Sequence, residues 1–320
     1  MAIFFYILTH NIVPIFLLII LGFLLNRKFD IHIYSLSKLL FYLFVPAFIF
    51  VNLYTATLQL NLFNVLLCGI FMLLVNDWIS RGIAKICGYD IGLTNAFKNS
   101  IMFNNSGNIG ISLITLVFTS SPFVLEGKTP YLHDAITAQI IILVLQNVTS
   151  NTIGFFNAGK ATMSTRKSLA QIFTMPSIYA VPLAFILKSA PIDLTATTIW
   201  PALEYLKNGL VPMSLLTLGI QLSKTCFDFK RKEVYLSVFI KLIISPLIAL
   251  VFIHLLGLSG VIAQTVFIAH AVPTAVNTAL IAVECDNNQN FAAQAVMMST
   301  IASAATLTLA IYAARIIFPV

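Results

Sequence analysis

The stretch "IMFNNSGNIGISLI" (101–114) mixes residues that suit lipid with residues that do not. It lies in a segment, 99–125, that carries no Asp, Glu, Lys or Arg and exceeds the roughly 20 apolar residues that a spanning helix needs. Its middle nevertheless holds three asparagines, a serine and two glycines. Glycine is about 1 kcal/mol less favourable than alanine in a helix, and Asn and Ser side chains compete for backbone hydrogen bonds. We therefore expect a membrane-spanning helix that unwinds part-way across the bilayer.

The whole chain has the composition of a polytopic, all-α membrane protein. Its 320 residues are 59% hydrophobic and 9% charged, with a mean hydropathy of +0.96, whereas soluble domains are about a quarter charged. Windows without charged residues predict ten transmembrane helices, because two windows are of double length and divide at 52–61 and 257–260. The windows are 2–26, 39–76, 99–125, 135–159, 168–187, 208–223, 242–283 and 287–314. We expect the first to be a span and not a cleaved signal sequence, because no basic segment precedes it.

The basic residues are distributed unevenly along the chain. Fourteen of the 18 Lys and Arg residues, Lys98 and Lys241 among them, flank the loops between spans 1 and 2, 3 and 4, 5 and 6, and 7 and 8. The other four are Lys128, Lys188, Lys207 and Arg315. By the positive-inside rule, the first set of loops is cytoplasmic and both termini lie outside the cell membrane. The net charge of +7 thus reflects topology, and we expect no nucleic-acid partner.

Matching features recur in the two halves of the chain at a nearly constant offset. Val13-Pro14 matches Val181-Pro182, "LFVP" (43–46) matches "GLVP" (209–212), and Asn108 matches Asn277. These matches predict a duplication with a first repeat at 1–159 and a second at 160–320. Because five spans is an odd number, the second repeat is inverted in the membrane. Inverted repeats are typical of secondary transporters, whose substrate sites lie at broken helices near the midplane.

The best pair of broken segments consists of "NNSGNIG" (104–110) in span 4 and "HAVPTAVNTAL" (270–280) in span 9. Pro273 removes a backbone donor and clashes with the carbonyl four residues earlier, so the second helix also breaks. Irregular backbone at this depth must face protein or a watery cavity. Each break exposes a half-helix N-terminus that attracts anions, and asparagine amides can donate to a carboxylate. We predict an anion site at Asn105, Asn108 and Asn277, the alternative being that these asparagines join helices structurally.

Charged and metal-binding residues are scarce at the predicted site. No Asp, Glu, Lys or Arg lies in the middle of spans 4, 5, 9 or 10, so a carboxylate proton relay has no candidate there. Asp77 is interpreted as an interfacial pair with Arg81, and His270 as a structural histidine. The four cysteines show no paired spacing. We expect no metal and no cofactor, with Na⁺ as an alternative coupling ion.

At these residues the chain resembles the auxin efflux carrier (PIN-like) family. The most specific segment is "HAVPTAVNTALIAVECDNNQNFAAQAVMMSTIAS" (270–303), which is similar to the family's Pro-Thr-Ala-Val-Asn pattern, its polar hinge and its Ala-rich helix. In span 4, Asn105 and "GISL" (110–113) fit, although Ser112 replaces a family proline. Gln146, in "VLQN" (144–147), matches a glutamine that lines the pocket in plant members. Bile acid/sodium symporters share the same broad architecture.

The resemblance implies a scaffold of spans 1, 2, 6 and 7 and an elevator-type transport domain of spans 3–5 and 8–10. It implies that Asn105 contacts the substrate carboxylate and that Pro273, Thr274 and Asn277 form the matching half of a crossover. The short loop between spans 5 and 6, at about 158–167, favours a prokaryotic-type member. Asn151 stands where plant members have an aromatic residue, a departure that argues against auxin as the substrate. Prokaryotic relatives are associated with small carboxylates such as malate or malonate.

The sequence thus predicts a secondary transporter of a small organic anion, moved as potential-driven efflux or uniport. The alternative is a sodium- or proton-coupled symporter of the bile-acid-carrier type, with neutral oxygens for Na⁺ from Asn105, Ser106, Gln146, Thr274, Gln294 and Ser299. Asn104, Ser106, Asn151 and Gln294 are predicted to support the substrate site. A channel or membrane sensor is a more remote alternative. Without an HExxH or GxSxG motif an enzyme is not expected, and for the assembly a homodimer remains open.

Overall fold

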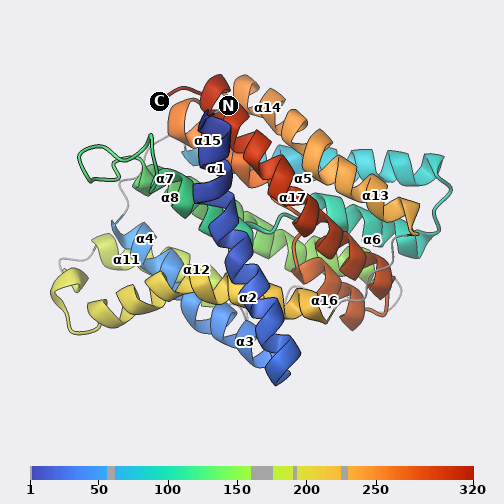
Figure 1. Cartoon of the computed structure of the whole chain (residues 1–320), viewed down its shortest axis with the longest axis horizontal. Coiled ribbons are helices and arrows are strands. Elements are labelled where there is room, and N and C mark those ends of the chain that lie inside the picture. The colour runs from blue at the N-terminus through green and yellow to red at the C-terminus, as the bar shows by residue number, and fades with distance from the viewer. Residues whose placement is uncertain (1, 56–61, 160–175, 190–192, 225–229) are drawn as a thin grey trace.

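The computed structural model describes residues 2–55, 62–159, 176–189, 193–224 and 230–320 (Figure 1). Within these ranges the chain is helical, and its extended pairings are two isolated β-bridges, Asn104 with Thr274 and Leu125 with Lys128. The predicted division between 159 and 160, and nearly all of the predicted loop between spans 5 and 6, lie outside the described residues. The prediction of an all-α membrane protein is confirmed.

The first half of the chain forms helices at each of the first five predicted spans. These are α1 (Ala2–Ile7), η1 (Leu8–Ile12), α2 (Val13–Phe29), α3 (Ile33–Leu39), η2 (Leu40–Phe44), α4 (Val45–Thr55), α5 (Leu62–Ile86), α6 (Ile91–Met102), η3 (Ser106–Gly110), α7 (Ile111–Phe118), α8 (Leu132–Thr149), η4 (Ser150–Gly154) and α9 (Phe155–Ala158).

The second half repeats this order, with broken helices again in the fourth position. Its helices are α11 (Pro176–Ser189), η5 (Leu194–Ala196), α12 (Trp200–Ser223), α13 (Lys232–Phe239), η6 (Ile240–Ile244), α14 (Ser245–Leu255), α15 (Gly260–Ala271), α16 (Asn277–Glu284) and α17 (Gln289–Ile317). The divisions predicted at 52–61 and 257–260 fall between helices. The helix α12 starts eight residues before the predicted window, which excluded charged residues and so began after Lys207. Within the added part of the helix, Glu204 and Lys207 pair at 2.9 Å.

In three places within the described ranges, a π-helical turn is followed directly by an α-helix whose second residue is a proline. Pro14, Pro46 and Pro246 each occupy the second position of the α-helix that follows η1, η2 or η6. A proline has no N–H to donate to the carbonyl four residues earlier, and its ring crowds that carbonyl. Single π turns are a known way to accommodate such a local disruption. The prolines therefore bend continuous helices and do not end them.

Six helices in the described part of the chain are long and apolar enough to cross a membrane. They are Ile3–Phe29, Ser35–Thr55, Leu62–Ile86, Leu132–Ala158, Lys232–Leu255 and Gln289–Ile317. Three shorter apolar helices, Ser106–Phe118, Tyr179–Ser189 and Gly260–Ala271, lie at predicted spans 4, 6 and 9. Spans 4 and 9 fall short of this length because each is divided into two helices.

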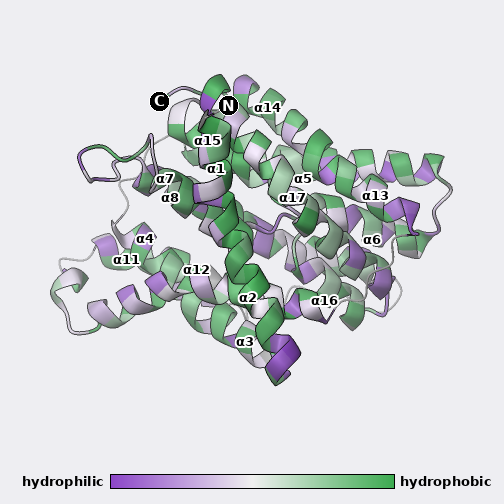
Figure 2. Cartoon of the chain, in the orientation of Figure 1, coloured by the Kyte–Doolittle hydropathy of each residue, from purple (hydrophilic) through white to green (hydrophobic). Residues whose placement is uncertain are grey.

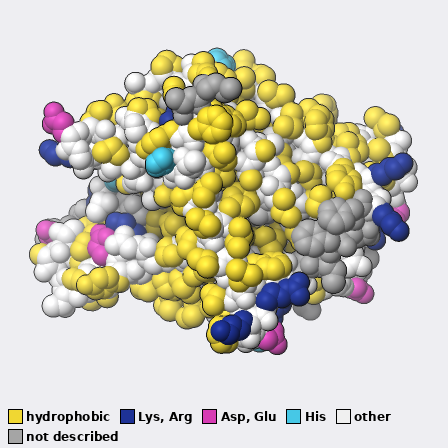
Figure 3. Space-filling view, in the orientation of Figure 1, with side chains coloured by type: hydrophobic (Ala, Val, Ile, Leu, Met, Phe, Trp, Pro, Cys, Tyr) yellow, Lys and Arg dark blue, Asp and Glu magenta, His cyan; other side chains and the backbone are white. Residues whose placement is uncertain are grey.

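The helix α2 shows why these segments suit a bilayer. Ile15 and Ile19 face the interior, while Leu17, Ile20 and Leu24 on the other side are at least half exposed. A helix that is apolar all round is buried in lipid or in a large core. Figure 2 shows the same hydrophobic character along most helices. In Figure 3, Lys, Arg, Asp and Glu lie mainly toward the margins of a largely uncharged face.

The helices from predicted spans 1, 2, 6 and 7 pack against one another. The helix α12 lies along α2, and α4 contacts both α11 and α12; Figure 1 shows α4, α11 and α12 grouped apart from α5, α6, α13 and α14. The tightest approach is at Gly22 and Gly219. A Cβ on Gly22 would lie 2.1 Å from the Leu216 oxygen, and one on Gly219 would lie 1.9 Å from the Ile19 oxygen. Glycines of this kind let two membrane helices approach backbone to backbone.

Candidate functional site

The two broken helices meet at their breaks. The helix α6 ends at Met102 and η3 begins at Ser106, while α15 ends at Ala271 and α16 begins at Asn277. Between them, the Asn105 N–H donates to the Pro273 oxygen at 2.8 Å, and the Ala275 N–H donates to the Phe103 oxygen at 2.9 Å. This pairing is the antiparallel bridge of Asn104 with Thr274. Each break thus satisfies backbone groups that the other leaves free, as buried polar backbone requires.

The first break follows from its local sequence. Asn105 precedes η3, and its Oδ1 accepts a hydrogen bond from the Asn108 N–H at 3.3 Å, which makes it the N-cap of the second half-helix. Gly110 lies against α8, where a Cβ would be 2.6 Å from Nε2 of Gln139. The break itself falls at 103–105, and Gly107 and Gly110 lie inside the π turn that follows.

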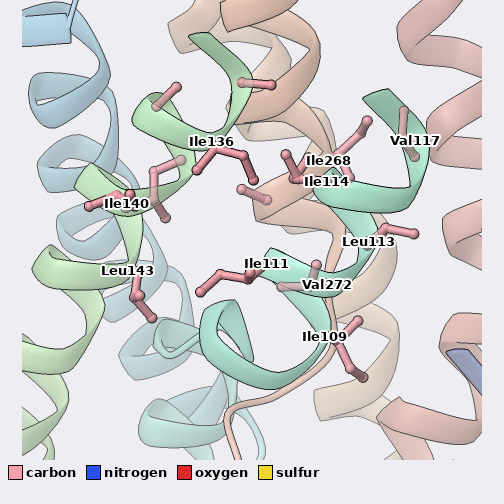
Figure 4. Close-up of a cluster of buried hydrophobic side chains, with 14 of the residues drawn as sticks. Ile109, Ile111, Leu113, Ile114, Val117, Ile136, Ile140, Leu143, Ile268 and Val272 are labelled. Atoms are coloured by element: carbon pink, nitrogen blue, oxygen red, sulfur yellow. The ribbon is translucent and has the colours of Figure 1, made fainter. Parts of the chain in front are cut away.

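A cluster of buried aliphatic side chains holds the second half-helix in place (Figure 4). Branched residues of η3 and α7 face those of α8 and α15 across this cluster. The labelled members are Ile109, Ile111, Leu113, Ile114, Val117, Ile136, Ile140, Leu143, Ile268 and Val272, all at most 4% exposed. Because lipid tails are as apolar as these side chains, close packing is what stabilises the cluster. The break is therefore a rigid feature set between packed helices.

A small polar cavity of about 40 Å³ lies beside the crossing. Its walls come from both breaks and from η2, η3, α8, η4 and the start of α16: Phe41, Phe103, Asn104, Asn105, Ser106, Gly107, Asn108, Gln146, Asn147, Ser150, Ala275, Val276 and Asn277. Nδ2 of Asn105 and Oγ of Ser106 are buried there and lack a hydrogen-bond partner within the described residues. A buried amide donor without a partner is costly, and a ligand that accepts from it would remove the cost.

Most of the predicted site residues come together at this cavity. Asn105, Asn108, Gln146 and Asn277 line it, as do the supporting residues Asn104 and Ser106. Gln146 also fixes the break, since its Oε1 accepts from the Asn104 N–H at 2.9 Å.

The other predicted residues have different surroundings. Pro273 and Thr274 form the crossing without lining the cavity; the Thr274 hydroxyl donates to the Ser100 oxygen at 2.8 Å, and its N–H donates to Ser299 Oγ at 3.2 Å. Asn151 donates to the Asn147 oxygen at 2.8 Å and does not line the cavity. Gln294 lies on α17, buried and outside the cavity walls.

Lys241 corrects one part of the sequence interpretation. The sequence places it among the residues that flank the cytoplasmic loop between spans 7 and 8, but it is 0% exposed inside η6. It lies nine residues after the start of α13, about 14 Å along a helix axis. Its Nζ donates to the Ile101 oxygen at 3.0 Å and to Oδ1 of Asn104. A buried lysine amine therefore contacts the end of α6 and a cavity-lining asparagine.

Lys98 is likewise buried and does not flank a loop in solvent, because α6 begins at Ile91, before the predicted window. Its Nζ lies 2.7 Å from Oδ1 of Asp77 and donates to Oδ1 of Asn157 at 3.0 Å. The predicted pair of Asp77 with Arg81 is confirmed at 2.6 Å. Asp77 therefore engages two cations, one exposed and one buried.

Phe41, Asn147 and Ser150 are cavity residues that the sequence interpretation missed. Phe41 reaches the site from η2, where its position among apolar neighbours gives no signal. Ser150, at the start of η4, follows Gln146 by four residues and Asn147 by three, a helical spacing that could have identified Ser150.

Two comparisons with known proteins bear on this site. A family described as "Membrane transport protein" matches residues 160–311. An uncharacterized transporter of Methanothermobacter thermautotrophicus is 24% identical over 314 residues, covering 94% of this chain and 96% of the relative. The second half of the chain is therefore similar to this membrane transport family. The resemblance to the auxin efflux carriers, which belong to the same family, is thereby confirmed. The matched region contains the second break and Lys241, and both descriptions point to a transporter, a class that is generally not enzymatic.

Proposed function

We propose that the protein is a secondary transporter of a small organic carboxylate, bound where the two broken helices cross. The observation that carries this proposal is the unpartnered Nδ2 of Asn105, buried in a polar cavity whose walls come from both breaks. Membrane transporters of inverted-repeat architecture bind their substrates at such discontinuous helices.

The chemistry of the cavity favours an anion. Asn105 presents an amide donor, Ser106 presents a hydroxyl, and η3 with α7 directs a half-helix N-terminus toward the same space. Lys241 places an amine that can become positively charged within one side chain of the cavity, through Asn104. No Asp or Glu is among the lining residues. A carboxylate would thus meet donors and a nearby cation without a facing negative charge.

The packing is compatible with an elevator-type movement. Ten spans in two inverted repeats would give a scaffold of α2, α4, α11 and α12, against which the crossing helices move. A second cavity, of about 580 Å³, lies between α4 and α12 on one side and α7 and α8 on the other. Along α8 its wall at Ile136 is ten residues, about 15 Å, from Gln146. With both termini outside, this cavity would be an outward vestibule of a carrier in the cell membrane.

The driving force depends on what moves with the anion. If the anion moves alone, an inside-negative potential of 100 mV favours expulsion of one negative charge by about 2.3 kcal/mol. Coupling to Na⁺ is the alternative, but several of the oxygens considered for it are already in use. Gln146 accepts from Asn104, and Ser299 accepts from Thr274.

The test uses the purified chain in liposomes. Malonate and malate are offered with and without an imposed potential, and in Na⁺ or K⁺ medium. We expect saturable uptake of at least one of them, and dependence on Na⁺ would favour the symporter. If neither dicarboxylate moves under any of these conditions, the proposed substrate class is wrong.

A further inference from the structure

Lys241 is buried at the crossing, yet no ion pair to it is formed within the described part of the chain. Its Nζ is held by two oxygens, the Ile101 carbonyl and Oδ1 of Asn104. Asp77, a carboxylate on the neighbouring helix α5, is already engaged by Arg81 and Lys98. A charged amine without a counter-ion is costly at zero exposure, and ionisable groups inside membranes are usually functional.

The number of acceptors fits a neutral amine better than an ammonium ion. An ammonium group has three N–H donors, and a neutral amine has two. Two acceptor oxygens pair both donors of the neutral amine, while the ammonium ion keeps one donor and one full charge without a partner. The donors of a deprotonated Lys241 are thus all paired in the site as it stands, and a nearby anion would supply what the protonated form lacks.

His270 is the titratable neighbour that shares Asn104 with Lys241. Because Lys241 donates to Oδ1 of Asn104, the other end of that amide donates to Nδ1 of His270, at 3.2 Å. A histidine that accepts at Nδ1 is neutral and carries its proton on Nε2. His270 therefore offers no negative charge to Lys241.

The charged and titratable groups on the other helices that pack against η6 are engaged elsewhere. On α6, Lys98 contacts Asp77; on α13, Glu233 lies 3.9 Å from Arg231, beside Lys232 at the start of the helix. On α14, Nδ1 of His254 lies 2.8 Å from the Leu250 oxygen, and on α17 Arg315 lies over the ring of Phe123. None of these groups forms an ion pair with Lys241 in the described ranges.

Asn104 connects this amine to the transport cavity. Its side chain holds Nζ of Lys241, and the same residue lines the cavity beside Asn105. A carboxylate bound to Asn105 would place its negative charge within about one side-chain length of Nζ. In a low-dielectric interior, opposite charges at such a separation attract strongly. Substrate binding and protonation of Lys241 would then each favour the other.

We propose that Lys241 carries the proton that accompanies the anion, so that the protein is a proton-coupled carrier. This proposal rests on the proposed carboxylate transport. When the anion enters, the lone pair of Nζ takes one proton from a hydronium ion in the adjoining water, so that one O–H bond breaks, one N–H bond forms and a water molecule is left. After the anion leaves on the other side, this N–H bond breaks and the proton passes to a water molecule there, which becomes hydronium. The empty site returns neutral, and the charge of Lys241 crosses the membrane only together with an anion.

The experiment measures malonate flux and internal pH in the same vesicles. Full-length protein is placed in liposomes that contain a pH-sensitive dye, with the potential clamped at zero by K⁺ and valinomycin. We expect labelled malonate entry to acidify the interior by about one proton per malonate, whereas entry of the dianion alone would not acidify it. Lys241→Arg keeps the charge but stays protonated, so malonate should still bind while acidification is lost.

Lys241→Met should lose acidification as well. The matched control is Lys85→Met, which removes an exposed lysine of α5 and should keep acidification. Binding in the wild type gives an independent measure, since the Kd for malonate should weaken by up to tenfold per unit of rising pH. Flux without acidification, acidification that survives in Lys241→Arg, or a Kd independent of pH overturns the proton-carrier role alone. Absence of both malonate flux and malonate binding in the wild type overturns carboxylate transport, and the coupling with it.

Discussion

Replacing Asn105 by alanine removes two interactions that can be measured separately. Its Oδ1 caps η3 through the Asn108 N–H, and its Nδ2 faces the cavity without a partner. Loss of the cap should lower stability by about 1 kcal/mol, within the usual range of roughly 0.5–2 kcal/mol. A hydrogen bond to a charged group contributes about 1.5–3 kcal/mol, so the Kd for malonate should rise about 10- to 140-fold.

Asn105→Asp distinguishes these two roles. The carboxylate keeps an acceptor for the Asn108 N–H but replaces the amide donor with a negative charge. We expect malonate binding at least as weak as in Asn105→Ala, because the buried carboxylate repels the anion; for stability, the retained cap and the cost of burying a charge act in opposite directions. Stability is followed by thermal melting in detergent, and affinity by calorimetric titration of malonate.

The matched control is Asn76→Ala. Asn76 is also a buried asparagine in a membrane helix, and its Nδ2 donates to Oγ of Ser245 at 3.1 Å. This variant should lose stability while keeping the wild-type Kd. If Asn105→Ala behaves in the same way, and Asn105→Asp restores stability with unchanged affinity, Asn105 is a structural cap and the reasoning fails.

Three further predictions concern packing, charge and specificity. Gly219→Ala places a methyl group against a backbone oxygen of α2, so we expect loss of folded protein on size-exclusion chromatography, whereas Gly82→Ala, with nothing within 4 Å, should fold normally. Lys98→Met removes the buried partner of the Asp77 carboxylate, and Arg81→Met removes its exposed partner, since the Arg81 side chain is 59% exposed. The melting temperature of Lys98→Met should therefore be well below that of Arg81→Met, and equal melting temperatures would contradict the buried pair. Phe41→Ala should widen the cavity and improve the Kd for phenylmalonate relative to malonate, and an unchanged ratio would show that this side chain does not limit substrate size.

The two breaks could be predicted from sequence because the residues that cause them are few and distinctive. Pro273 and the group of Asn, Ser and Gly at 104–110 disturb a helix wherever they occur, and the repeat offset pairs the two segments. The site residues on these segments and Gln146 accordingly meet at one cavity. Family resemblance added Gln146, which span composition alone would not have selected.

The burial of Lys98 and Lys241 was not predicted from the sequence, because it depends on where the helices begin. Lys98 and Lys241 stand next to apolar windows, so a count of charge-free residues places them in loops. The helices α6 and α13 start seven and nine residues before these lysines, at Ile91 and Lys232, and draw both side chains into the interior. Phe41 was missed for a different reason, since an aromatic residue in an apolar span looks the same whether it faces lipid or a cavity.

Counterflow of labelled malonate is the most direct test of the proposal that the crossing is a carboxylate transport site. Liposomes with the wild-type protein are loaded with unlabelled malonate and diluted into a trace of labelled malonate. Binding at a moving site predicts transient accumulation of label above equilibrium in the wild type, a loss of this overshoot in Asn105→Ala, and its retention in Asn76→Ala. An overshoot that is equal in Asn105→Ala, or label that enters the wild type without any overshoot, would contradict a carrier that binds its substrate at this crossing.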